Sequence, residues 1–369
     1  MNSVNECRLR ACRGSGKILL LSLQSLYVAA LAGRILKRRK NLLKRLNMDL
    51  LSRVLSLIPV TGRLDVRCHF GAPWAISQGN SAIREIPYHV LLSGEAVLEY
   101  GDSAPEKLIA GDIIVFPAGG AHRIHDGSGE SASPPAERQS MSLMIAENEG
   151  AGAQADILCG RFLVGAVPDR LLRDHLPGRL VVRSALHGPG ATNGEGDPAA
   201  SMAGSRLARL IELMREEAVD EGPGSETLVG HLSAALFALT LRFASVGPQA
   251  PHGLLALAGR PRLQPAISAM FESPAQPWTL DQFAALCNMS RATFVRQFQD
   301  AIGRSATDVL TEVRMTLAGR TLLQSGLAVA EIGEMVGYQS DAAFQRVFKR
   351  LIGVTPARYR ASGGQVEAG

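Results

Sequence analysis

Two stretches decide the fold of the C-terminal part of the chain: Met289–Phe298, with the sequence MSRATFVRQF, and Gln339–Phe348, with the sequence QSDAAFQRVF. At one constant spacing, the second stretch repeats a serine, two phenylalanines and an arginine of the first. A glycine follows each stretch, at Gly303 and Gly353, and a hydroxyl residue suited to cap another helix comes two residues later. A repeat this specific indicates one structural unit used twice, and two copies are too few for a solenoid.

Each stretch is predicted to be the second helix of a helix-turn-helix unit. In the first unit Thr279 caps a short helix, Cys287–Met289 forms a tight turn and Ser290 caps the next helix. In the second unit the turn is Gly337–Gln339, and Ser340 caps the helix that follows it. A long amphipathic helix over Val309–Leu323 is expected to hold the units at a fixed separation. The apolar residues expected to face inward are Leu280, Phe283, Ala284, Leu286, Phe294, Val295, Phe298, Val329, Ile332, Met335, Val336, Phe344, Val347 and Phe348.

The outer faces of the two second helices carry side chains that suit a DNA groove. A helix enters the major groove only if its outer face can hydrogen-bond base edges and phosphates, and Arg and Gln do this well. A solvated helix shows a similar face, but duplication at matched spacing favours recognition. Because Arg291 occupies the position of Asp341, the two units are expected to read different bases. The residues expected to contact DNA are Arg291, Thr293, Arg296, Gln297, Asp341, Gln345, Arg346 and Lys349.

Residues 278–360 as a whole resemble the DNA-binding domain of AraC/XylS-family transcription regulators. In one departure, Ala306 and Val309 stand where the family has a proline and an aromatic residue. The resemblance implies a sequence-specific regulator that contacts two successive major grooves of promoter DNA, with RNA polymerase as a partner. The residues that carry it are Met289, Ser290, Arg291, Phe294, Arg296, Phe298, Gly303, Arg314, Ala318, Leu322, Leu323, Val336, Gly337, Tyr338, Ser340, Phe344, Arg346, Val347, Phe348, Lys349, Gly353, Thr355, Pro356, Tyr359 and Arg360.

The first 48 residues determine the sign of the net charge. They hold eleven Lys and Arg against the single acid Glu6, whereas the whole chain carries +5, so residues 49–369 carry −5. Affinity for DNA must therefore come from the placement of individual arginines. The apolar run 18–33, followed at once by the basic block 34–40, fits a cleaved signal or a membrane-surface helix less well than an extension translated from a start codon upstream of Met48.

Five cysteines are scattered along the chain without a metal-type spacing. An odd number in this pattern does not form a disulfide framework and indicates a reducing compartment. A cytoplasmic location without a membrane partner is therefore expected.

The region from Leu50 to about His125 is expected to form short strands of a small β-barrel. Two β-rich runs, 88–92 and 96–100, are separated by a hairpin-like break at Ser93–Glu95, and Gly111-Asp112 makes a turn within 108–117. A further strand is expected over 157–164. The Gly-, Ser- and Pro-rich residues 126–153 are expected to form a long surface loop, and a second loose loop is expected after His187.

Gly111, Pro117, Gly119 and His122 fall at the spacing of the second cupin motif. Together with the stretches 72–75 and 158–162, they make the segment 49–245 resemble the cupin-type sensory domain of a subgroup of AraC regulators. No histidine lies between Trp74 and Pro87, where the first cupin motif would supply metal ligands, so we expect no metal site and no cofactor. A regulator rather than an enzyme is expected for the same reason.

Two cysteines of this domain, Cys68 and Cys159, look like those of cupin-bearing AraC regulators that respond to reactive chlorine species. A basic neighbour such as Arg67 or His69 would stabilise a thiolate, the form that oxidises readily. His89 and His122 are candidates to assist or to bind a soft metal. The alternatives, cysteines that pack as small hydrophobes and histidines that are satisfied core residues, stay open.

Two long helical patterns after residue 200 are typical of a pair that couples domains or supports a homodimer, and a purely structural role stays open as the alternative. Their apolar faces contain Leu207, Leu210, Ile211, Leu213 and Met214, and then Leu228, Leu232, Ala235, Leu236, Leu239 and Leu241.

The sequence as a whole predicts an α+β protein with a cupin-like β-barrel and helical pair at residues 49–245 and an all-α domain with two helix-turn-helix units at residues 263–361. An extension (1–48), a linker (246–262) and a tail (362–369) complete the chain. The expected function is transcription regulation through DNA, with cysteine oxidation as the signal. A small organic effector and, less favoured, a cupin enzyme with a helical tail are the alternatives.

Overall fold

The structure is a computed structural model that describes residues 49–82, 84–140, 143–165, 168, 170–173, 176–183, 198–219, 222–246, 253, 256–257 and 260–365. The expected extension 1–48, the loop after His187 up to residue 197 and most of the linker 246–262 lie outside these residues.

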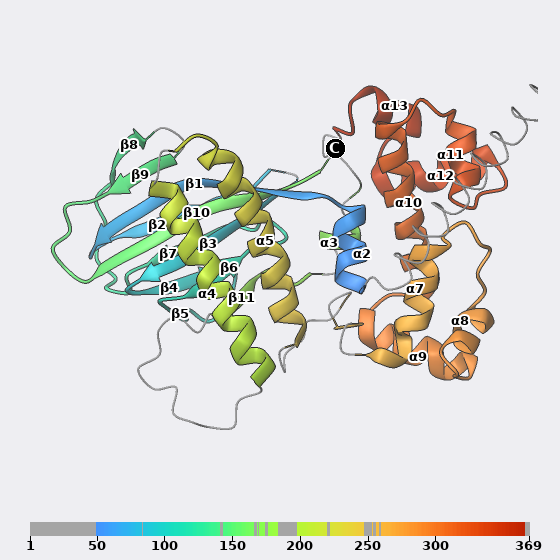
Figure 1. Cartoon of the computed structure of the whole chain (residues 1–369), viewed down its shortest axis with the longest axis horizontal. Helices are drawn as coiled ribbons and strands as arrows, with labels where there is room; N and C mark the ends of the chain where they lie inside the picture. Colours follow the sequence, from blue (N-terminus) through green and yellow to red (C-terminus); the bar gives the residue numbers. More distant parts are fainter. Residues whose placement is uncertain are drawn as a thin grey trace, which may run out of the picture. The chain divides into compact units, whose positions relative to one another are not determined.

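Two β-sheets share one apolar core in the N-terminal domain (Figure 1). The strands are β1 (Val60–Gly71), β2 (Ala75–Gln78), β3 (Glu85–Ser93), β4 (Glu95–Tyr100), β5 (Glu106–Ile109), β6 (Asp112–Val115), β7 (His122–His125), β8 (Ala136–Ser140), β9 (Leu143–Glu147), β10 (Gln154–Val164) and β11 (Leu180–Arg183). Within the described residues, one sheet has the order β11-β6-β3-β10-β1-β9-β8 and the other β2-β7-β4-β5. Phe70, Leu98 and Phe116 lie between the sheets, which confirms the predicted cupin-like β-domain.

Two glycine turns move the chain from one sheet to the other. Gly94, with φ of 85°, separates β3 in the larger sheet from β4 in the smaller, and Gly111, with φ of 92°, separates β5 from β6. Both positions require the left-handed backbone conformation that glycine adopts without strain. The predicted turn at Gly111-Asp112 is confirmed, but the break at Ser93–Glu95 does not form a hairpin, since β3 pairs with β10 and β6 rather than with β4.

Two segments differ from the sequence prediction. Residues expected to begin the strands instead form helix α2 (Leu50–Leu57), which buries Leu50, Val54 and Leu57 on one side. This spacing is that of a helix face, not of a strand. The expected loop 126–153 contains β8 and β9, and β9 pairs in parallel with β1. Leu143 and Ala146 of β9 are buried. The apolar residues of this segment therefore form a strand although the flanking residues are rich in Gly and Pro.

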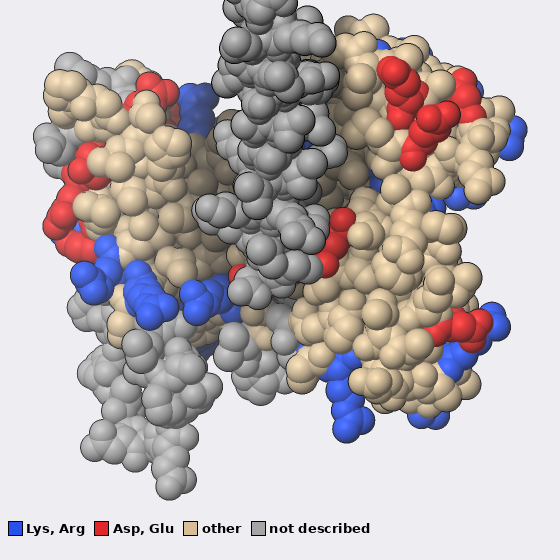
Figure 2. Space-filling view, turned by 45° about the vertical axis from the view of Figure 1, so that its right-hand side comes forward, with Lys and Arg blue, Asp and Glu red and all other residues tan. Residues whose placement is uncertain are grey.

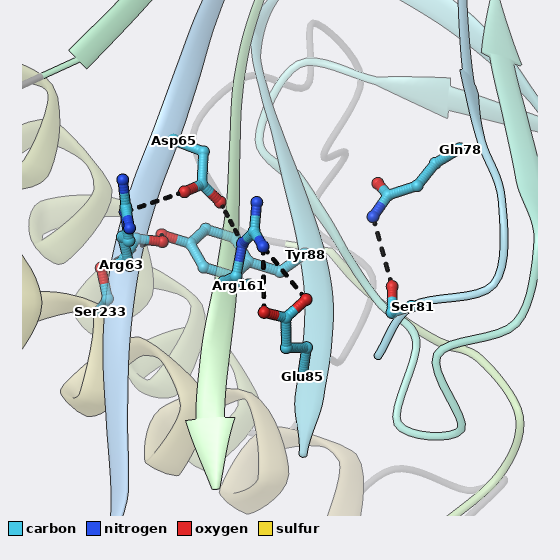
Figure 3. Close-up of polar contacts among 8 residues, drawn as sticks. All are labelled: Arg63, Asp65, Gln78, Ser81, Glu85, Tyr88, Arg161 and Ser233. Carbon is cyan, nitrogen blue, oxygen red and sulfur yellow. Dashed lines mark hydrogen bonds and ion pairs between the residues drawn. The ribbon is translucent and has the colours of Figure 1, made fainter. Parts of the chain in front are cut away.

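Helices α4 (Pro198–Val219) and α5 (Ser225–Val246) lie side by side, with α5 on β1 of the larger sheet (Figure 1). The approach is close, because a Cβ on Gly62 of β1 would lie 2.0 Å from the Cβ of Ser233 in α5. The buried Tyr88 and Ser233 hydroxyls are 3.1 Å apart and tie β3 to α5, beside the charged residues that Figure 3 shows on β1, β3 and β10. The helix pair is thus firmly attached to the sheet.

The inward faces of α4 and α5 are only partly as predicted. Leu207, Ile211 and Met214 are buried in α4, but Leu213 is 40% exposed, and Leu228 of α5 is 41% exposed. Helix α5 has apolar residues on nearly all sides, so the spacing of these residues does not show which face of the helix is buried. The same composition makes α5 the one described helix long and apolar enough to cross a membrane, which its packing on β1 accounts for.

The C-terminal helices follow the predicted duplication closely. Thr279 and Gln282 form a capping box at α8, and the side chains of Ser290, Ser305, Ser340 and Thr355 accept hydrogen bonds from the starts of α9, α10, α12 and α13. The helices are α3 (Arg170–Arg173), α7 (Gln264–Glu272), α8 (Leu280–Leu286), α9 (Arg291–Ile302), α10 (Ala306–Gln324), α11 (Val329–Met335), α12 (Asp341–Ile352) and α13 (Pro356–Ala361), with a short 3₁₀ helix η1 (Pro261–Leu263).

Equivalent turns join the two helices of each unit. Asn288 has a φ of 52° in the first turn, and Gly337 has a φ of 92° in the second. Gly333 takes the place of Ala284 because a Cβ there would lie 3.1 Å from the ring of Phe344. Three residues predicted to face inward are instead exposed: Leu286 (40%), Val295 (42%) and Met335 (50%).

Candidate functional site

The outer face of α9 carries the first group of predicted DNA contacts. Arg291 and Arg296 are exposed, and Arg291 Nη1 lies 3.7 Å from Asp281 Oδ2 in a surface ion pair. Such an exposed pair is worth little, so the arginine is available to a phosphate or a base. Thr293 and Gln297 are half-buried at the flanks of this face, and the Thr293 hydroxyl accepts a hydrogen bond from the capping Ser290 at 2.9 Å. The capping role fixes the start of α9.

Helix α12 carries the second group and contains an internal hydrogen bond. Gln345 Nε2 donates to Asp341 Oδ2 at 2.8 Å, while Arg346 and Lys349 are exposed nearby. This bond holds the Gln345 amide and leaves its Oε1 and second N–H free, the pair of groups that recognises adenine. Asp341 is therefore placed to orient Gln345 as well as to accept a hydrogen bond from a base.

Charge is not spread as a broad basic band on the visible surface. Figure 2 shows Lys and Arg in small separate groups, interspersed with Asp and Glu, on the face that it presents. This distribution agrees with the net charge of residues 49–369 and leaves recognition to individual side chains such as Arg296 and Arg346.

Replacing Arg296 or Arg346 with alanine is expected to weaken DNA binding about tenfold or more, each at a different half-site, because each arginine is exposed on its own second helix. Affinities for operator variants with one altered half-site, measured at fixed salt, check this expectation. Lys107→Ala, which removes one positive charge from the sensor strand β5, serves as the control. Equal effects of both arginine variants at both half-sites would contradict an asymmetric site.

The four predicted sensor residues come together within the β-domain. Cys159 of β10 lies opposite His89 of β3, and Cys68 of β1 is displaced by two residues from Val66, the partner of Cys159. His89 Nδ1 is 3.0 Å from Cys159 Sγ, and His89 Nε2 is 2.8 Å from His122 Nε2. Cys68 has the largest influence on the pKa of the Cys159 thiol, and both cysteines belong to the core between the sheets. The spacing of the cupin motif and the resemblance therefore selected side chains that are spatial neighbours.

The donor and the acceptor of each hydrogen bond in this cluster can be assigned. His122 Nδ1 lies 2.9 Å from the carbonyl oxygen of Gly120, which can only accept, so this nitrogen carries the proton. In a neutral ring, His122 Nε2 must then accept from His89 Nε2–H, and His89 Nδ1 must accept from the Cys159 thiol. The result is a continuous donor chain from Cys159 through His89 and His122 to Gly120.

Both histidines are neutral near pH 7. Burial, followed by the proximity of His122, lowers the pKa of His89 to about 3. Burial also lowers the pKa of His122, although its hydrogen bond to Gly120 opposes the shift. The Phe116 ring stacks on His122 with centroids 3.6 Å apart and would favour a transient positive charge there.

The expectation that Arg67 or His69 stabilises a thiolate is not met at Cys159. Arg67 Nη2 lies 2.8 Å from Asp156 Oδ2 and His69 Nδ1 lies 3.6 Å from Asp156 Oδ1, so both basic groups face a carboxylate. The neighbouring Cys68 thiol and then burial raise the pKa of the Cys159 thiol well above its usual range. Cys159 therefore stays protonated at neutral pH, and its reactivity depends on a proton acceptor.

Sequence reasoning missed the partners that complete this site. Gly120 contributes only its backbone carbonyl oxygen, which no residue type reveals. Asp156 of β10 accepts a hydrogen bond from Arg67 of β1, and this contact depends on the pairing of two strands far apart in the sequence. Phe116 precedes the proline of the cupin motif and was the one detectable neighbour. Across the described ranges, no group of three His, Cys, Asp or Glu residues is arranged to hold a metal ion.

A cavity of about 220 Å³ lies away from the thiols, against the start of α5. Its lining residues are Gly62, Arg63, Leu64, Leu143, Leu163, Glu226 and Val229.

Comparison with known proteins covers both domains. Residues 49–194 match the family described as Cupin, and residues 283–362 match the family described as Helix-turn-helix domain. The chain is 29% identical over 316 residues to an uncharacterized HTH-type transcriptional regulator of Haemophilus influenzae, covering 85% of this chain and 99% of that protein.

Two further relatives match over a similar extent. Identity is 28% over 313 residues to the RCS-specific HTH-type transcriptional activator RclR of Escherichia coli, covering 85% of this chain and 97% of that protein. It is 28% over 323 residues to the HTH-type transcriptional regulator MtrA of Neisseria gonorrhoeae, covering 86% and 100%. With its cupin domain and its two helix-turn-helix units, the chain is a DNA-binding transcription regulator of the AraC/XylS family.

Proposed function

We propose that the cupin domain senses an oxidant through the thiols of Cys68 and Cys159 and thereby controls transcription. The observation that carries this proposal is that the two cysteines are neighbours in the β-domain core and that Cys159 Sγ lies 3.0 Å from His89 Nδ1. A buried thiol with a raised pKa reacts only if its proton can leave, and the histidine chain provides the acceptor. The name of the Escherichia coli relative, which describes it as RCS-specific, agrees with this chemistry.

The proposed reaction uses an electrophilic chlorine oxidant such as hypochlorous acid. One thiol attacks the chlorine, forming a sulfenyl chloride and releasing water, and the second thiol then displaces chloride to form the S–S bond. Overall, two thiols and one HOCl give one disulfide, one water, one chloride ion and one proton. As Cys159 loses its proton to His89 Nδ1, His89 passes its Nε2 proton to His122.

Disulfide formation would shift the strand that carries the helix pair. The two sulfur atoms must approach to about 2.05 Å, which draws β1 and β10 together locally. Because α5 packs on β1 at Gly62, a shift of β1 is passed to α5. The helix pair would then carry the signal, in agreement with the coupling role expected from its sequence.

Several finer assignments belong to the same proposal. The chain acts in the cytoplasm as an activator that works with RNA polymerase, and α4 and α5 support a homodimer. The cupin domain serves as a sensor and not as an enzyme, since the relatives are named as regulators.

Replacing Cys68 or Cys159 with serine is expected to abolish induction by hypochlorite, because either change removes one sulfur of the disulfide. Expression from a target promoter, located first by genome-wide mapping of the bound DNA, measures the response. Peptide mapping without reductant should show a Cys68–Cys159 link in the oxidised wild type. Cys287→Ser, which changes a buried cysteine of the DNA-binding domain, is the control. An unchanged response in both serine variants would refute the thiol mechanism and favour a small organic effector.

A further inference from the structure

Val295 is an exposed aliphatic side chain in the middle of a polar helix face. The exposed residues of α9 recur at helical spacing, at Arg291, Ala292, Val295, Arg296, Gln299 and Asp300. The opposite face buries Phe294 and Phe298 against the domain core. Val295 therefore lies at the centre of the outer face that contains both exposed arginines of this helix, and it is 42% exposed.

The duplication gives Val295 a counterpart. In the repeat register, Val295 corresponds to Gln345, which stands before Arg346 as Val295 stands before Arg296. Single exposed apolar residues are common on protein surfaces and need no explanation by themselves. Here, however, an apolar residue and an amide occupy equivalent positions on the second helices of the two units. Because these two side-chain types suit different bases, the difference indicates which base each unit prefers at this position.

We infer that Val295 recognises the 5-methyl group of a thymine in the major groove, whereas Gln345 recognises an adenine at the equivalent place in the other half-site. Thymine is the only base that presents a methyl group there, and apolar side chains contact it. The hydrogen bond from Gln345 to Asp341 orients the amide for adenine, as described above. The inference rests on DNA binding by the two helix-turn-helix units and adds base identity to it.

A methyl-deletion experiment tests this inference. The purified full-length chain first selects its preferred duplexes from a random library, and each thymine of the selected site is then replaced with uracil, which lacks only the methyl group. The wild type is expected to lose about fourfold in affinity at one thymine of the first half-site, the effect of burying one methyl-sized group. Val295→Ala is expected to lose about the same affinity on thymine DNA and to be insensitive to that uracil.

Two further variants complete the test. Val295→Gln should change the preferred base at that position from thymine to adenine, a gain that a folding defect cannot produce. Leu228→Ala, at a side chain of α5 with nearly the same exposure (41%), should keep the full uracil effect. If no thymine shows a methyl effect, or if Val295→Ala keeps it, the inference is wrong although DNA binding stands. If the wild type selects no sequence, sequence-specific DNA binding itself is overturned, and the inference with it.

Discussion

Replacing Phe344 with alanine is expected to lower the free energy of unfolding of the DNA-binding domain by roughly 3–5 kcal/mol, the cost of deleting a buried aromatic side chain. Phe344 is 0% exposed, and its ring lies 5.7 Å from that of Tyr338 and 5.8 Å from that of Phe348 between centroids. No side chain can fill the space, because Gly333 on the facing helix has none. Denaturant unfolding followed by circular dichroism measures the change.

The neighbouring Gln345→Ala variant is the matched control for this result. Gln345 is half-buried on the same helix, and its side chain donates a hydrogen bond to Asp341. It should leave the unfolding free energy within about 1 kcal/mol of the wild type, the worth of one such bond, while weakening DNA binding. Equal destabilisation by both variants would show that the aromatic core does not hold the second unit together.

Acidification is expected to destabilise the sensor domain because His89 is buried in its neutral form. Its pKa is about 3 in the folded domain against 6.5 for an ordinary histidine, so between these values the unfolded chain binds a proton that the folded chain does not. Stability is therefore full above pH 6.5 and falls as the pH is lowered toward 3. Each pKa unit corresponds to about 1.4 kcal/mol, which gives a loss of roughly 2 kcal/mol at pH 5.

The buried Trp74 provides a fluorescent probe for this measurement. Trp74 is 3% exposed in the β-domain core, and Trp278 is the chain's other tryptophan, so a Trp278→Phe background isolates the signal. His89→Gln should flatten the pH dependence between 6.5 and 4, leaving the smaller slope of His122, whereas exposed His231→Gln should not. A slope unchanged by His89→Gln would contradict the assignment of the loss to this ring.

The duplicated helices could be predicted from sequence because their signals are local. Thr279, Ser290 and Ser340 cap helices from side-chain chemistry alone, and the repeat confirms the caps at Ser290 and Ser340 by matching them to each other. The burial of individual side chains could be predicted less well. Val295 and Met335 are apolar residues next to the buried stripe, and a helix of seven or twelve residues does not fix the edge of its buried face to within one position.

The candidate sensor site was predicted in its members but not in its electrostatics. Cys68, Cys159, His89 and His122 were identified from a motif and a resemblance, and their proximity depends only on the strand register. The protonation of Cys159 depends instead on the neighbouring Cys68 and on burial, while Arg67 and His69 pair with Asp156. Helix α2 and strand β9 were not predicted although their apolar spacing is local, and both pack against distant parts of the chain.

Tyr88 and His89 are consecutive residues of β3, and side chains of consecutive strand residues point to opposite faces. His89 belongs to the hydrogen-bonded chain inside the β-domain, while Tyr88 bonds Ser233 of the helix layer outside it. One peptide group joins the two residues, so the same short stretch of β3 backbone carries both side chains. A single strand of the sheet thus contacts the histidine chain on its inner face and the helix layer on its outer face. A change at the histidines can therefore reach α5 through β3, without a moving loop.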